Sequence, residues 1–85
     1  MYHVFNGQRY KVNDISHLPN GEFGDCDNDN HIIRIPRDGD TLDELDTITH
    51  EALHAGMPFL AEECVTANAK SVSTLLWRLG WRKEE

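Results

Sequence analysis

The segment HEALH places two histidines, His50 and His54, four positions apart, with Glu51 directly after the first. On a helix, side chains at i and i+4 share one face with Cβ atoms ~5–6 Å apart, so both imidazoles can bind one Zn²⁺ at ~2.0–2.1 Å. Glu51 projects about 100° around the helix axis from His50, where it can take a proton from a water molecule bound to the zinc. The pattern therefore predicts a zinc hydrolase centre with two histidine ligands and a glutamate as general base.

A third protein ligand is needed, because catalytic zinc sites usually have three protein ligands and one open position. The nearest candidates are Glu62 and Glu63, at the start of the next apolar-periodic segment. The other residues able to bind zinc are His3, His17, His31, Cys26 and Cys64.

The motif lies on a predicted helix over residues 41–55. Thr41 is a suitable N-cap, and Glu44 three residues later completes a capping box. Gly56 suits the position just after the helix, and Pro58 prevents its continuation. An apolar stripe at helical spacing consists of Leu42, Leu45, Ile48, Ala52 and Ala55. Both histidines lie about 150° or more from the centre of this stripe, outside the core face.

A second helix is predicted over residues 60–79, with Gly80 ending it. Its apolar stripe consists of Ala61, Val65, Ala69, Val72, Leu76 and Leu79. Glu62 lies about 85° from the centre of that stripe, whereas Glu63 lies about 175° away and faces solvent. Glu62 is therefore the better third ligand, with Glu63 as the alternative. Asn68 is a candidate hydrogen-bond partner for a ligand.

The segment before the helices indicates a small sheet. YHVF-NG-QRYKV predicts a β-hairpin over residues 1–12, since Asn-Gly tolerates the positive φ angles of a type I′ turn. Residues 13–30 are rich in Gly and Asx and are expected to be loop. HIIRI, 31–35, is a short strand that Pro36 ends. The fold class is therefore α+β: one domain, 1–85, with a small antiparallel sheet packed on two C-terminal helices.

Composition restricts the function classes. The chain has 85 residues, a net charge of −7 and 2 cysteines. The negative charge argues against general nucleic-acid binding, and no apolar run reaches membrane-spanning length. The N-terminus lacks the apolar region of a secretory signal, so a reduced cytoplasm with free cysteines is expected. Trp77 and Trp81 fit packing or an interface, which leaves a homodimer open.

Three segments of the chain resemble a known protein family. HEALHA, then LAEECV, then a helix ending in LLWRLGW, is similar to the very small gluzincin-type metallopeptidases of phage and prophage genomes, distant relatives of the ImmA/IrrE and SprT-like groups. The resemblance covers roughly residues 22 to 82 and includes TLDELDTIT and IIRI. It implies a minimal zincin-like fold and, if phage-encoded, a host cytoplasm. It also implies that His50 and His54 bind zinc, that Glu51 is the base, and that a glutamate of LAEE is the third ligand.

Two functions remain open. The first is a zinc-dependent metallopeptidase-like hydrolase acting on a peptide or protein. The resemblance implies that 31–35 is the edge strand beside its cleft, where an extended peptide can pair. Arg34 or Arg37 is a candidate to stabilise the oxyanion. The second is a non-catalytic zinc-stabilised binding module, which the small size favours because little chain remains for a substrate domain.

Overall fold

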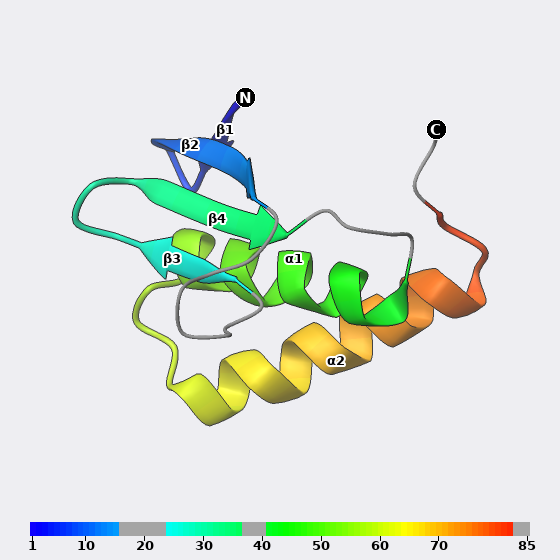
Figure 1. Cartoon of the computed structure of the whole chain (residues 1–85). Coiled ribbons are helices and arrows are strands. Elements are labelled where there is room, and N and C mark those ends of the chain that lie inside the picture. Colours follow the sequence, from blue (N-terminus) through cyan, green and yellow to red (C-terminus); the bar gives the residue numbers. More distant parts are fainter. Residues whose placement is uncertain (16–23, 37–40, 83–85) are drawn as a thin grey trace.

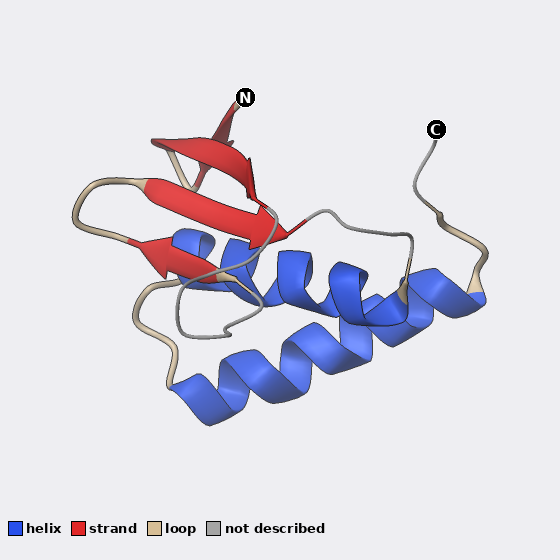
Figure 2. Ribbon diagram, viewed as in Figure 1, coloured by secondary structure: helices blue, strands red, loops and turns tan. Residues whose placement is uncertain are grey.

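The computed structural model describes residues 1–15, 24–36 and 41–82 and has the expected α+β class. Figures 1 and 2 show a layered arrangement in which α1 lies between the sheet and α2. The elements in chain order are β1 (Tyr2–Phe5), β2 (Gln8–Ile15), β3 (Asp25–Asp27), β4 (Ile32–Pro36), α1 (Leu42–Gly56) and α2 (Glu62–Arg78).

The predicted hairpin is confirmed. Asn6 and Gly7 connect β1 to β2 with φ angles of 50° and 79°, the left-handed values that a type I′ turn requires. Phe5 pairs with Gln8 across this turn. Strand β2 continues to Ile15, three residues beyond the predicted end of the hairpin, because it also pairs with β4.

The sheet is mixed, not antiparallel as predicted. Its strand order is β1-β2-β4-β3, and the central β2–β4 pair is parallel. The difference arises from β3, which lies within the segment 13–30 that was predicted to be loop. β3 forms an antiparallel hairpin with β4, so the chain reverses once more before β4 and runs alongside β2.

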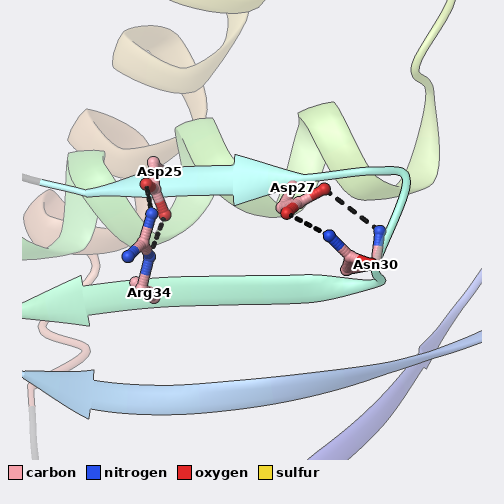
Figure 3. A network of polar contacts seen from close by, with 4 residues as sticks. All are labelled: Asp25, Asp27, Asn30 and Arg34. Atoms are coloured by element: carbon pink, nitrogen blue, oxygen red, sulfur yellow. Dashed lines mark hydrogen bonds and ion pairs between the residues drawn. The ribbon is translucent and has the colours of Figure 1, made fainter.

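Polar contacts stabilise the β3–β4 hairpin (Figure 3). Arg34 of β4 donates from Nε to Asp25 Oδ1 at 2.8 Å, and its second contact with this carboxylate makes a two-pronged ion pair. Asp27 accepts hydrogen bonds from the backbone N–H groups of Asp29 and Asn30, both at 3.0 Å. Asn30 Nδ2 donates to the same carboxylate at 2.9 Å. The Asx-rich segment therefore forms a turn that closes a strand pair.

The prediction that residues 31–35 form an edge strand is wrong. Strand β4 lies inside the sheet, between β2 and β3. Ile33 and Ile35 are buried, as expected for alternate side chains of an interior strand. In the described sheet, β3 is the edge strand next to β4, and β1 is the edge strand on the opposite side.

Helix α1 begins where the sequence predicts. The hydroxyl of Thr41 accepts a hydrogen bond from the backbone N–H of Glu44 at 3.1 Å, which satisfies one of the free donors of the first turn. Its end differs by one position: Gly56 is the last helical residue and Met57 is the C-cap, with its N–H donating to Leu53 O at 2.8 Å.

Helix α2 ends in a Schellman motif. Gly80 adopts φ 95°, and its N–H donates to Trp77 O at 3.0 Å, while the N–H of Trp81 donates to Leu76 O at 3.1 Å. This confirms Gly80 as the residue that ends the helix. Trp81 itself is 66% exposed.

The buried face of α2 is narrower than the predicted stripe. Val65, Ala69 and Ser73 are its buried residues, one turn apart, whereas Val72 and Leu79 are exposed. The reason is that α2 packs extensively against α1 alone, and one helix contacts another along a single i, i+4 ridge. Small side chains on this ridge allow the two helices to approach closely.

The core lies between the sheet and α1. Its buried residues are Tyr10, Ile33, Ile35 and Ala55, with Phe5, Val12, Cys26 and Ile48 packed around them. The hydroxyl of Tyr10 donates to Asn28 Oδ1 at 2.7 Å, which satisfies its polar atom. In the described part of the chain, no helix combines the length and the apolar character needed to cross a membrane.

Candidate metal centre

His50 and His54 lie one above the other on the C-terminal half of α1, on the side that faces the start of α2. Each side chain is 23% exposed, so both are partly buried and neither is a freely solvated surface histidine. The rings pack edge to face with centroids 4.9 Å apart. Their Nε2 atoms converge to 3.2 Å, which is the i, i+4 geometry that the sequence predicts.

Glu62, the first residue of α2, completes the group. Its Oε1 lies 2.9 Å from His50 Nε2, and its Oε2 lies 2.8 Å from His54 Nε2. A tight connection places it there: the N–H of Leu60 donates to Met57 O at 3.1 Å, directly after the end of α1. Candidate ligand atoms of the three side chains all lie within 4.8 Å of one another.

The structure places the other candidate ligands elsewhere. Glu63 is exposed on α2 and does not belong to the group, although it is adjacent to Glu62 in sequence. His3 lies on β1 and Cys26 on β3, while His31 precedes β4. Cys64 is exposed on α2. His17 lies outside the described residues.

The donor set fits a zinc ion. Two ligands of a tetrahedral zinc at ~2.0–2.1 Å are about 3.3 Å apart, close to the 3.2 Å between the two Nε2 atoms. A carboxylate only accepts hydrogen bonds, so each Nε2 would have to face Glu62 as an N–H donor. The two Nε2–H groups would then lie against each other, which is electrostatically unfavourable. A divalent cation removes this conflict, because it binds two unprotonated nitrogens and the carboxylate together.

Glu51 is buried, with 7% of its surface exposed, although it lies outside the predicted apolar stripe. It faces β3: a Cβ atom added at Gly24 would lie 3.4 Å from Glu51 Cγ. Burial, followed by the negative charges of Glu51, Asp25 and Asp27, raises the pKa of Cys26 to about 11. The carboxylate that was predicted to be the general base therefore lies between the histidine-bearing helix and the edge strand.

Two supporting roles expected from the sequence are not seen. Arg34 was a candidate for the oxyanion, but its guanidinium is bound to Asp25. Asn68 Nδ2 donates to Cys64 O at 2.8 Å, one turn back in its own helix, and not to a candidate ligand. Arg37 lies outside the described residues.

The sequence did not predict strand β3, nor that β3 and the preceding Gly24 cover Glu51. A Cβ at position 24 would also lie 2.9 Å from both Arg34 O and Thr47 Cγ2, so only glycine allows β3 to approach α1 this closely. One sequence signal could have indicated this contact. Gly24 directly precedes DCD, and a glycine at a strand often marks a close approach of another element to the backbone.

Comparisons with protein-family models, with curated proteins and with solved structures found no match to this chain. Function is therefore inferred from the residues and geometry of the site.

Proposed function

We propose that this chain is a zinc-dependent hydrolase of the metallopeptidase type. His50, His54 and Glu62 bind the zinc ion, and Glu51 is the general base. The observation that supports this most directly is the convergence of three ligand atoms from two helices within 4.8 Å, next to a buried glutamate in the HExxH position.

The chemistry divides between the ion and the chain. A zinc ion at this site supplies a Lewis acid that polarises a carbonyl and lowers the pKa of a water molecule toward ~7. Glu51 would act as the general base, taking a proton from a water molecule and passing it to the leaving amine. Glu51 directly follows His50 on α1, and its burial beside Gly24 restricts the side chain. Such restriction favours a single productive orientation of the base.

The substrate class follows from the sheet. β3 (Asp25–Asp27) contacts α1, and among the described strands it is an edge strand with β4 as its one neighbour in the sheet. An extended peptide can pair with such an edge and pass close to Glu51. Peptide or protein substrates therefore suit this site, with β3 in the role that the sequence had given to residues 31–35.

The test compares the zinc-loaded protein with its Glu51→Gln variant on a mixture of unstructured peptides, with cleavage followed by mass spectrometry. We expect the variant to keep zinc and lose about 10²–10⁴-fold in rate, the usual contribution of a general base. Glu63→Gln is the matched control and should cleave normally, because Glu63 is exposed on α2. Equal rates for the wild type and Glu51→Gln, or no cleavage by either, would remove the catalytic role.

A non-catalytic zinc-stabilised module is the second candidate, and one observation favours it. α2 packs extensively on α1 alone, and the three candidate ligands connect the end of α1 to the beginning of α2. A zinc ion there would hold the two helices together in a domain with a small core. This candidate predicts that zinc raises the melting temperature while neither the wild type nor Glu51→Gln cleaves peptides.

A further inference from the structure

The outer face of the sheet, which points away from α1, carries a row of residues unlike the rest of this acidic chain. Tyr2 pairs with Lys11, and Lys11 pairs with Ile32, so their side chains lie side by side across three strands. Arg9 is two residues before Lys11 on β2 and therefore projects from the same face. Tyr10, between them, points the other way into the core.

These residues surround a shallow cavity of about 430 Å³. Its lining consists of Tyr2, Arg9, Lys11, Asn30, His31 and Ile32. The lining holds two cations and no carboxylate, in a chain whose net charge is −7. We call this cavity the sheet-face pocket.

The two cations of the sheet-face pocket are free to bind a ligand. Within the described ranges, neither Arg9 nor Lys11 forms an ion pair with a carboxylate. Arg34, on the same face, is by contrast bound by Asp25 (Figure 3). Arg9 lies over the ring of Tyr2, with its Cζ 4.1 Å from the ring centroid. This contact orients the guanidinium and leaves its N–H edge available for two parallel hydrogen bonds.

His31 is held in the pocket wall by an unusual backbone. Its φ is 55°, a left-handed value that few residues other than glycine adopt. Its carbonyl accepts from the Lys11 N–H at 2.9 Å, and its ring stacks on Tyr10 at 4.7 Å. Residues in such conformations are concentrated at ligand sites, where the surrounding structure fixes them. The backbone of His31 therefore forms part of the pocket wall, whereas its ring lies against Tyr10 on the core side of the sheet.

We infer that the sheet-face pocket binds a phosphate group. Phosphate carries up to two negative charges and at least three acceptor oxygens, which suits a guanidinium and an ammonium that line one cavity. Arg9 makes the two-pronged contact and Lys11 supplies a point charge. The overall negative charge still opposes binding along an extended nucleic-acid backbone, so a small phosphate compound is the expected source.

The test uses the full chain with His54→Ala as background, so that phosphate cannot bind at the metal centre. Inorganic phosphate, adenosine monophosphate and a ten-nucleotide single-stranded DNA are titrated separately at constant ionic strength, and ¹H–¹⁵N NMR reports which residues respond. The decisive variant is Arg9→Gln/Lys11→Gln. Its matched control is Lys70→Gln/Arg78→Gln, which removes the same charge from exposed positions on α2.

We expect saturable shifts at Arg9, Lys11 and His31 with phosphate and with the monophosphate. The decisive variant should weaken both by roughly tenfold or more, and the control by less than about twofold. Saturation by DNA alone would assign the site to a nucleic-acid backbone. The absence of saturable shifts with any phosphate probe, or equal losses in both double variants, would overturn the inference. Well-dispersed spectra of both variants verify that they fold.

Discussion

The Nε2 atoms of His50 and His54 lie 3.2 Å apart, and the carboxylate of Glu62 reaches both of them. The two histidines belong to one helix, but Glu62 begins the next, so the group forms only when the two helices are packed together. Binding of a metal ion by this group would therefore be linked to the packing of α2 on α1: each would favour the other.

Removal of Glu62 should abolish tight zinc binding, while removal of its neighbour should not. We expect Glu62→Ala to weaken zinc affinity by about 100-fold or more, since losing even an outer partner of a ligand costs about 10- to 100-fold. Glu63→Ala is the matched control, because Glu63 is exposed and outside the group. Competition with a chromophoric zinc chelator measures both affinities. Equal affinities in the two variants would refute the assignment of Glu62.

Chelation should destabilise the protein. At free zinc about 100-fold above the dissociation constant, binding contributes about 2.7 kcal/mol to the free energy of unfolding. For a domain of this size, that corresponds to a fall of about 10 °C or more in melting temperature on metal removal. Thermal unfolding followed by circular dichroism, with and without chelator, measures the change. His54→Ala is the control and should show no response to chelator; a response equal to that of the wild type would place the stabilising metal elsewhere.

The thiol reactivity of Cys26 should report on the position of Glu51. With a pKa of about 11, Cys26 is about one-thousandth thiolate at pH 8, so alkylation should be slow and should accelerate as pH rises toward 11. Glu51→Gln removes a nearby negative charge, which should lower the pKa of Cys26 and speed its labelling. Mass spectrometry after iodoacetamide treatment measures the rates at Cys26 and at the exposed Cys64.

Glu63→Gln serves as the control for this thiol experiment, because it removes the same charge from a solvent-facing position. It should leave the Cys26 rate unchanged. If Glu51→Gln and Glu63→Gln give the same rate as the wild type, the carboxylate of Glu51 does not face β3, and its proposed place beside a bound peptide is lost.

Local sequence signals predicted the helices and the candidate site. Thr41 marks the start of α1 and Gly80 the end of α2, because capping depends on a few adjacent residues. The positions of the histidine pair and Glu62 could also be predicted from the sequence, since helical spacing places side chains on a known face. The choice of Glu62 over Glu63 depended on the angle between neighbouring positions on one helix.

The sheet was less predictable because its determinants are distant in sequence. β3 is three residues long and depends on pairing with β4 and on the contact of Asp25 with Arg34, nine positions away. No local periodicity reveals such a strand. The burial of Glu51 was missed for the same reason, since the element that covers it had been predicted to be loop.

Gly24 is the position where this distant contact can be tested. A Cβ atom there would lie 2.9 Å from Arg34 O and 2.9 Å from Thr47 Cγ2. The first of these is backbone inside the sheet and the second belongs to the helix that carries the histidines. Because Arg34 O is backbone of the sheet, it cannot yield as a side chain can, so a Cβ at position 24 forces a local rearrangement of β3 and its neighbours.

We therefore expect Gly24→Ala to lower the free energy of unfolding by about 1–3 kcal/mol, the usual cost of overpacking. Gly56→Ala is the control: no atom lies within 4 Å of a Cβ there, and alanine at the end of α1 should be neutral or stabilise by up to about 1 kcal/mol. Urea unfolding measures both. Because the displaced strand covers Glu51, Gly24→Ala should also speed the labelling of Cys26. Wild-type stability in Gly24→Ala would mean that β3 does not pack against α1 in this way.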